Sequence, residues 1–205
     1  MTKVFVSYCH CQGNWVWERL APCLKAGGAE VLIDRERFVL GKALIGQMDA
    51  LQDQADKHLL VLSDDYLRSA YCRHEMDRAI ALDPDFNLGV VIPLLRGACT
   101  LPASITKPNP LYADLIDDSK ADPWALTLQQ CDATDLGTTA PAWLAARDDI
   151  ARYLERNASV NLVVDNGVSS RNHAVGSNSH SVYSRDSKII GHKSKKIFSK
   201  AYCLQ

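Results

Sequence analysis

Short apolar runs alternate with segments of helical periodicity along most of the chain. The apolar runs are rich in Val, Leu and Ile and are typical of β-strands, whereas the periodic segments predict helices. A weaker fifth strand is expected near residues 126–131. This alternation predicts an α/β fold with a doubly wound, flavodoxin-like sheet of five parallel strands flanked by helices. The four clearer strands are KVFVSY (3–8), AEVLID (29–34), HLLVLS (58–63) and LGVVIPLL (88–95).

Three helices between these strands each carry one apolar stripe, with residues spaced three or four positions apart. Such a stripe buries one face of a helix against a sheet. A Gly27-Gly28 pair is expected to end the first of these helices, because glycine readily adopts the backbone conformation found after a helix C-terminus. The stripes consist of Val16, Leu20, Cys23 and Leu24; of Leu44, Met48, Leu51 and Ala55; and of Cys72, Met76, Ala79 and Ile80.

The C-terminal part of the chain changes character twice. Residues 96–137 are irregular and rich in proline, and a last helix is expected over 140–157. We therefore expect one folded domain over residues 1–158. From there on, Ser, Asn and Lys prevail, with seven Lys or Arg against two Asp, so a poorly ordered basic tail is expected over 159–205. Within it, SVNLVV (159–164) is apolar enough to form one more strand.

The composition limits the class of protein and its partners. Of the 205 residues, 47% are hydrophobic, and the net charge is −1, which describes a soluble globular protein with no general attraction to nucleic acid. The lysines of the tail leave a contact with nucleic acid or an anionic surface as an alternative to a solubilising role. No apolar run has a length near the about 20 residues of a membrane span, and none resembles an export signal. Seven irregularly spaced cysteines without a C-x-x-C predict reduced thiols and a cytoplasmic protein.

Polar residues gather directly after the predicted strands. Because ligands of doubly wound sheets bind beyond the carboxyl ends of the strands, these residues are candidates for a binding site. They are Ser7, Tyr8, Cys9 and His10 after the first strand; Asp34, Gly41 and Lys42 after the second; and Ser63, Tyr66, Ser69, Tyr71 and Glu75 after the third.

With these positions in place, the chain resembles the TIR (Toll/interleukin-1 receptor) domain family over about residues 3–157. Three stretches carry the resemblance, in the order and at the spacing of the family. VFVSYCH is similar to the family's first box, VLIDRERFVLGKAL to its second strand and BB loop, and LLVLSDDYLRSAYCRHEMDRA to its third strand and following helix.

Enzymatic TIR domains cleave NAD+ at the nicotinamide–ribose bond and use the glutamate of a W-C-x-x-E-L pattern. Here that pattern reads YCRHEM, from Tyr71 to Met76. The resemblance implies that Glu75 is catalytic and that Tyr71, one turn earlier on the helix, packs against the nicotinamide or the ribose. One carboxylate is sufficient, because nicotinamide leaves as a neutral pyridine that needs no proton. NAD+ is then consumed as a substrate, and no cofactor or metal ion is expected.

The resemblance implies an NAD+ glycohydrolase of the bacterial type, acting in defence signalling or NAD+ depletion. Its products would be nicotinamide and ADP-ribose or a cyclic variant. His10 stands where enzymatic relatives often carry Arg, so its contact with ribose or phosphate would depend on pH. The expected substrate-binding residues are Ser7, Tyr8, Cys9, His10, Asp34, Gly41, Lys42 and Tyr71.

The segment RERFVLGK (35–42) combines charges with three consecutive apolar residues that no local pattern buries. An exposed apolar tip of this kind is a candidate contact surface. In enzymatic relatives the corresponding loop packs beside the cleft of a neighbouring subunit, which implies head-to-tail association with other TIR domains. The expected self-association residues are Arg37, Phe38, Val39 and Leu40.

Plainer alternatives stand beside these assignments. Glu75 is also compatible with a solvated helix glutamate, and Asp34 with a turn residue. The spacings C-x-C and C-x-H around Cys9 and Cys72 are poor matches to structural zinc sites, so no metal site is predicted. A catalytically silent TIR adaptor, acting through association of TIR domains, is the rival function.

Overall fold

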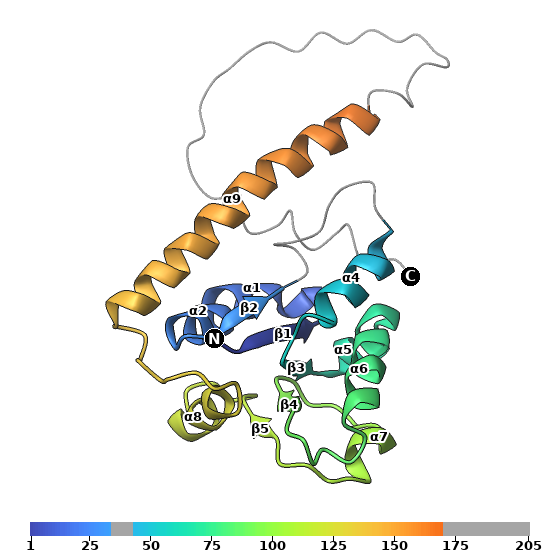
Figure 1. Cartoon of the computed structure of the whole chain (residues 1–205). Helices are drawn as coiled ribbons and strands as arrows, with labels where there is room; N and C mark the ends of the chain where they lie inside the picture. The colour runs from blue at the N-terminus through green and yellow to red at the C-terminus, as the bar shows by residue number, and fades with distance from the viewer. Residues whose placement is uncertain (34–42, 170–205) are drawn as a thin grey trace, which may run out of the picture. The chain divides into compact units, whose positions relative to one another are not determined.

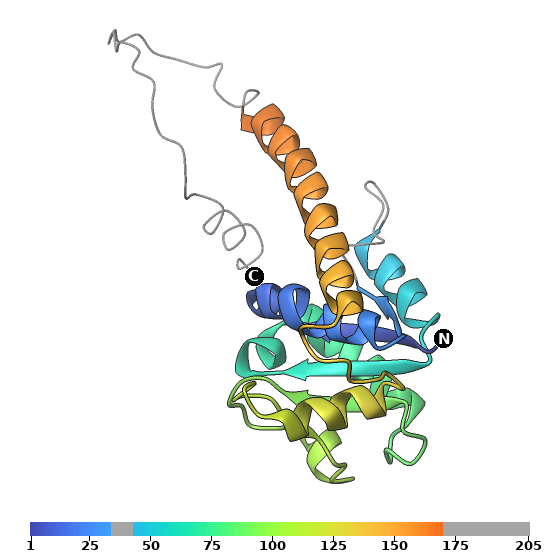
Figure 2. The same ribbon diagram turned by 90° about the vertical axis from the view of Figure 1, so that its left-hand side faces the viewer.

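The computed structural model describes residues 1–33 and 43–169, with side chains described up to residue 156. Within these ranges, five strands form one sheet in the order β2-β1-β3-β4-β5, and every neighbouring pair is parallel. The arrows of Figure 2 run side by side in a common direction. The fold class expected from the sequence is therefore confirmed. The strands are β1 (Lys3–Tyr8), β2 (Glu30–Leu32), β3 (Lys57–Leu62), β4 (Val91–Leu95) and β5 (Ala113–Asp114).

Helices cover both faces of the sheet (Figure 1). The segment from α1 to α2 shares one face with α8, since Trp15 of α1 stacks on Trp124 of α8 at 5.6 Å. The other face carries α4, α5 and α6. The bounds are η1 (His10–Gln12), α1 (Gly13–Trp15), the π-helical turn η2 (Val16–Leu20), α2 (Ala21–Ala26), α4 (Leu44–Gln52), α5 (Asp64–Arg68), α6 (Ala70–Leu82), α7 (Ala103–Thr106), α8 (Ala121–Gln130) and α9 (Pro141–Ser169).

The fifth strand is not where the sequence pattern placed it. Residues 126–131 lie in and just after α8, and the edge strand β5 consists of only two residues. Thr127, Leu128 and Cys131 are buried at positions i, i+1 and i+4, which is the spacing of one helix face. The short β5 carries no alternation long enough to be recognised in a sequence.

The hydrophobic core lies on both sides of the central strand β3. Leu59, Leu60 and Val61 of this strand have no solvent exposure. Each such side chain contributes about 1.5–3 kcal/mol relative to exposure. On the α6 side, Leu60 packs in one cluster with the predicted α6 stripe, all four members of which are buried. The stripe of α4 is shorter than predicted, because Leu44 lies at the helix start with 38% exposure.

The Gly27-Gly28 stop after α2 is confirmed. Gly28 has a φ of +97°, a conformation that side chains with a Cβ rarely adopt. At Gly27 the reason is space, because an added Cβ would lie 2.6 Å from the backbone oxygen of Thr134. The amide of Thr134 donates to the Gly27 oxygen at 2.9 Å, so this close approach joins the loop after α8 to the end of α2.

An aromatic and charged cluster joins the edge of the sheet to its helices. The Arg96 guanidinium, just after β4, lies 4.8 Å from the Trp15 ring centre, and Arg19 stacks on Trp124 at 5.7 Å. Asp118 accepts from the Trp15 indole at 2.7 Å and pairs with Arg19 at 3.2 Å. These contacts connect α1, η2 and α8 around a two-residue strand that has few backbone bonds of its own.

The last helix begins at the expected place and extends further than predicted. It runs from Pro141 to Ser169, so residues 159–164 are helical and do not form the further strand that their apolar character allowed. The chain divides into two compact units, Met1–Tyr153 and Leu154–Gln205. None of the helices in the described part of the chain combines the length and the apolarity needed to cross a bilayer.

Candidate functional site

Glu75 lies on the buried face of α6. Ser69 caps this helix, since its hydroxyl accepts from the amide of Cys72 at 3.3 Å. Cys72, Glu75, Met76 and Ala79 follow at helical spacing, and all four are buried. Glu75 exposes only 6% of its surface, which excludes a solvated helix glutamate. An ionisable side chain at such a position needs hydrogen-bond partners, because burial removes its hydration.

One partner of the Glu75 carboxylate is Ser7, near the carboxyl end of β1. The Ser7 hydroxyl donates to Oε2 of Glu75 at 2.5 Å, and it lies 2.7 Å from the hydroxyl of Tyr66. All three side chains are buried. Strand β1, helix α5 and helix α6 thus each contribute one side chain to this group, which we call the Glu75 triad: Tyr66, Ser7 and Glu75.

The direction of the hydrogen bonds in the Glu75 triad follows from the donor count. Burial, with a smaller contribution from the nearby charge of Glu75, raises the pKa of Tyr66 well above its ordinary value. Tyr66 is therefore a neutral phenol with one proton to donate. Because the single hydroxyl proton of Ser7 is directed to Glu75, Ser7 accepts from Tyr66. The chain of donation runs from Tyr66 to Ser7 to the carboxylate.

The backbone around Glu75 is held from α4. The buried side chain of Gln52 donates from Nε2 to the backbone oxygen of Glu75 at 2.8 Å, and its Oε1 accepts from Arg78 at 3.3 Å. His74 and Arg78 also reach Asp49 of α4, at 2.8 and 3.3 Å. These polar contacts hold α6 against α4 and orient the turn that carries the carboxylate.

The other expected site residues in the described part of the chain are Tyr71, Tyr8, Cys9 and His10. Among them, Tyr71 lies one turn before Glu75 but is 52% exposed, so the two side chains occupy different environments. The ring of Tyr8 packs against Trp17 at 6.4 Å on the opposite face of β1 from Ser7, as alternation along a strand requires. Cys9 and the exposed His10 continue into the η1 turn. The structure thus brings Ser7 to Glu75 in a hydrogen bond, and leaves the side chain of Tyr8 in the core.

Seven expected residues lie outside the described part of the chain. They are Asp34, Gly41 and Lys42 of the expected substrate site and Arg37, Phe38, Val39 and Leu40 of the expected self-association loop. Their assignments stay predictions.

Gln52 belongs to the site without having been selected from the sequence, and Tyr66 was a candidate after the third strand but was not among the expected substrate-binding residues. Tyr66 stands in the stretch after the third strand, but nothing local distinguishes its hydroxyl from that of Tyr71. Gln52 directly follows the buried Leu51 at the end of α4. A glutamine at the edge of a buried stripe is the available signal, because buried amides need partners.

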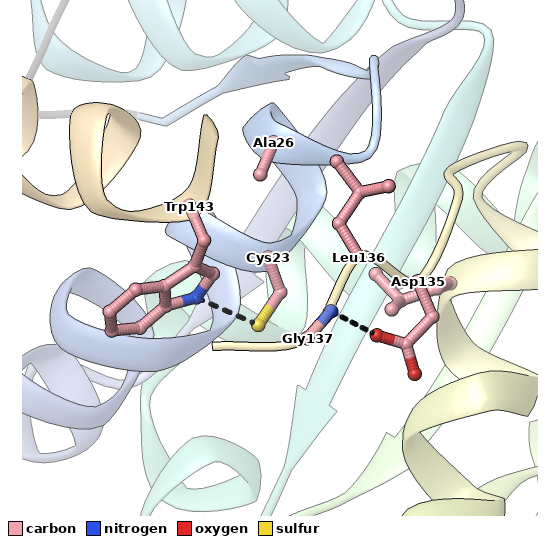
Figure 3. Close-up of a pocket in the computed structure, with 7 residues that line it drawn as sticks. Cys23, Ala26, Asp135, Leu136, Gly137 and Trp143 are labelled. Atoms are coloured by element: carbon pink, nitrogen blue, oxygen red, sulfur yellow. Dashed lines mark hydrogen bonds between the residues drawn. The ribbon is translucent and has the colours of Figure 1, made fainter. Parts of the chain in front are cut away.

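Two hollows lie between described residues. One, of about 10 Å³, lies between α2 and the start of α9, where the Trp143 indole donates to the sulfur of Cys23 at 3.3 Å (Figure 3). The other, of about 170 Å³, is lined by Gln52, Asp53, Arg78, Ala81 and Leu82. Both are smaller than the about 300 Å³ or more of common ligand pockets. Within the described ranges, no group of three His, Cys, Asp or Glu side chains has a metal-binding arrangement.

Comparison with known proteins agrees with this geometry. The family model of the TIR domain matches residues 4–129, which is more than half of the chain and includes the whole Glu75 triad. A stretch of 72 residues is 28% identical to human Toll-like receptor 1 and 26% identical to human Toll-like receptor 6. Each match covers 35% of this chain and only 9% of the receptor.

The fold has a counterpart among solved structures. The crystal structure of the TIR domain of the Toll-related receptor TRR-2 from Hydra magnipapillata matches with a TM-score of 0.50 and 17% identity. The match covers 58% of this chain and 88% of that chain. At this identity, the similarity concerns the fold alone. Together with the family model, it shows that the chain belongs to the TIR domain family.

Proposed function

We propose that this chain is an NAD+ glycohydrolase with Glu75 as its catalytic residue. The observation that carries the proposal is the buried Glu75 carboxylate, which accepts a 2.5 Å hydrogen bond from Ser7 beside the carboxyl end of β1. This is the region where doubly wound sheets bind their ligands. The enzymatic members of the TIR family use a glutamate at the matching position. For this reason we assign the catalytic role to the Glu75 carboxylate.

The proposed reaction breaks the bond between the ribose C1′ and the nicotinamide nitrogen. The bonding electrons leave with the nitrogen, which becomes a neutral pyridine, and positive charge develops on the ribose. The carboxylate of Glu75 stabilises this charge and binds ribose hydroxyls, and both interactions are stronger in a desolvated site than in water. Water then adds to C1′ and releases a proton to the solvent, which gives ADP-ribose. Attack by a hydroxyl or nitrogen of the same molecule gives a cyclic product.

The burial of Glu75 implies a conformational requirement. With 6% exposure, the carboxylate is closed to a ribose until neighbouring side chains move. A TIR domain of this kind is expected to be nearly inactive as a dilute monomer and to gain activity on association, with NAD+ and other copies of the domain as its partners. The cytoplasmic location, the similarity to the bacterial type of TIR domain and the defence role stay predictions.

The test is nicotinamide release by the purified full chain. NAD+ turnover is measured by chromatography over about a hundredfold range of protein concentration, with and without a crowding agent. We expect release of nicotinamide with a specific activity that rises with concentration. Phe38→Asp is expected to abolish that rise and to leave the fold intact, because a charge at an apolar contact opposes association.

The rival function is a silent TIR adaptor. It is favoured by the names of the matched human proteins, which are receptors. In that case no nicotinamide is released at any concentration, while sedimentation still shows association that Phe38→Asp prevents. Nicotinamide release without association would instead show a site complete within one chain.

A further inference from the structure

Two cysteines lie in contact directly after the strand that carries Ser7. Cys9 precedes the η1 turn, whose first backbone bond joins the amide of Gln12 to the Cys9 oxygen at 2.8 Å. This turn folds the chain back so that Sγ of Cys11 lies 2.8 Å from Sγ of Cys9. Both are free thiols, and Cys11 is exposed. A disulfide bond joins sulfurs at about 2.05 Å, so a small movement of the exposed Cys11 side chain would close one.

The surroundings of Cys11 favour its neutral thiol. Its thiol donates to Cys9 and lies 3.5 Å from Oδ2 of Asp65. Burial first, then Cys9 and Asp65, raise the pKa of the Cys11 thiol. Hydrogen bonds from Arg68 and Cys11 lower the pKa of Asp65, so Asp65 is an ionised acceptor. Because the raised pKa of Cys11 disfavours its thiolate, the attack on an oxidant is assigned to Cys9.

The cysteine pair is connected to the Glu75 triad. Cys9 follows Ser7 by two residues and packs against the cluster that contains Tyr66 and Cys72. The Cys72 thiol in turn lies 3.6 Å from the backbone oxygen of Tyr8. A change in the backbone at Cys9 is therefore transmitted to the end of β1, where the Ser7 hydroxyl must hold its position to reach the carboxylate.

We propose that Cys9 and Cys11 form an oxidation site that closes reversibly to a disulfide when the protein meets a hydroperoxide. Closing the bond tightens the η1 turn and displaces Ser7 from Glu75. The effect on catalysis rests on the NAD+ glycohydrolase activity proposed above, whereas the disulfide itself does not.

The proposed reaction has two steps. The sulfur of Cys9 attacks the distal oxygen of the hydroperoxide, which breaks the O–O bond and gives a sulfenic acid and water or an alcohol. Cys11 then attacks the oxidised sulfur, its thiol proton goes to the departing hydroxide, and water leaves. Two thiols lose two electrons, and the hydroperoxide takes up both. A thiol reductant reverses the change by thiol–disulfide exchange.

The sequence allows a direct test by peptide mapping with hydrogen peroxide as the probe. Trypsin cleaves after Lys3 and Arg19, and the peptide between them contains Cys9 and Cys11 and no other cysteine. The full chain is treated with peroxide, alkylated and digested. We expect this peptide to lose two hydrogen atoms in mass and to take up no alkyl group. Treatment with dithiothreitol after the peroxide and before alkylation is expected to restore alkylation at both cysteines.

Two variants complete the test. Cys11→Ser is expected to prevent the internal bond, and Cys99→Ser, at a half-buried cysteine outside the pair, to behave like the wild type. Full alkylation of the peptide after peroxide treatment, or linkage of Cys9 to a different cysteine, would overturn the proposal. Nicotinamide release is expected to fall about tenfold on oxidation of the wild type, and to recover on reduction, with no such reversible loss in Cys11→Ser. An equal reversible loss in Cys11→Ser would remove the link to catalysis, and absence of NAD+ cleavage would refute the proposed function while the mapping still decides the disulfide.

Discussion

Ser7 and Glu75 are separated by 68 positions in the sequence, and the Ser7 hydroxyl lies 2.5 Å from a carboxylate oxygen of Glu75. Ser7 is the last residue but one of β1, and Glu75 lies in the middle of α6. Their contact exists only when α6 is packed on the sheet. The site and the core are therefore formed together, and changes at the site must be separated from changes in stability.

Replacing the carboxylate of Glu75, the proposed catalytic group, is expected to abolish turnover without unfolding the chain. Glu75→Gln keeps the size of the side chain and an oxygen that accepts from Ser7, but it removes the charge that stabilises the oxocarbenium ion. Nicotinamide release should fall by about 100-fold or more, with an unchanged circular dichroism spectrum. Glu18→Gln, at an exposed glutamate of η2, is the matched control and should retain activity. Near-normal turnover by a folded Glu75→Gln protein would exclude Glu75 as the catalytic residue.

Tyr66 is expected to act as a positioning residue for Ser7. Tyr66→Phe removes the hydroxyl that donates to Ser7, and loss of this buried hydrogen bond should cost about 1 kcal/mol of stability. We expect kcat to fall about tenfold at nearly constant KM, because Ser7 then orients the carboxylate less well.

The control for Tyr66→Phe is Tyr112→Phe, at a tyrosine with 41% exposure. It should change neither kcat nor KM. If Tyr66→Phe lowers the melting temperature but leaves kcat as in the wild type, the hydroxyl has a structural role only.

His58 is expected to make the folded state sensitive to mild acid. Burial, and to a smaller extent the Arg78 charge, lower the pKa of His58, whose Nδ1 has no hydrogen-bond partner in the described part of the chain. Below about pH 6.5 the unfolded chain binds a proton at this residue that the folded chain does not bind. The contribution of His58 to the free energy of unfolding should therefore decrease as the pH falls from about 6.5 to the pKa of His58 in the folded chain. Below that pKa, this contribution should stay constant.

The variant His58→Leu tests this dependence. It removes the titrating group from a buried position beside Phe5 and leaves no polar atom without a partner there. Between about pH 7.5 and about pH 5.5, its melting temperature should decrease less than that of the wild type. Parallel curves for the two proteins would show that other groups cause the acid sensitivity.

Removal of the chain beyond Ala158 is expected to leave the TIR domain folded. Ile150 is the last residue of the described side chains that is fully buried, so the shortened α9 keeps its core contact. The melting temperature should stay within about 3 °C of the full chain, with one cooperative transition. Loss of soluble folded protein would show that the remainder of α9 is required for folding.

The sequence by itself determined the elements and the family. The four longer strands are short, continuous apolar runs, and the helices between them carry apolar stripes with a period of 3.6. Both patterns can be read from local stretches of sequence. The same reasoning placed Cys72 and Met76 on the buried face of α6, with Glu75 between them. The resemblance to the TIR boxes then gave Glu75 its proposed catalytic role, and the buried position of its carboxylate supports that proposal.

Only the tertiary structure decided which side chains meet. The two-residue strand β5 forms because it pairs with β4 and packs against α8, and no local sequence pattern predicts it. Ser7 and Tyr8 are equivalent in a list of polar residues, yet the alternation of β1 directs Ser7 to Glu75 and Tyr8 to Trp17. Tyr66 and Gln52 contact Ser7 and Glu75 only because α5 and α4 pack beside β1 and α6. A hydrogen bond depends on distances of a few tenths of an ångström between residues far apart in the sequence, and packing of the helices on the sheet sets those distances.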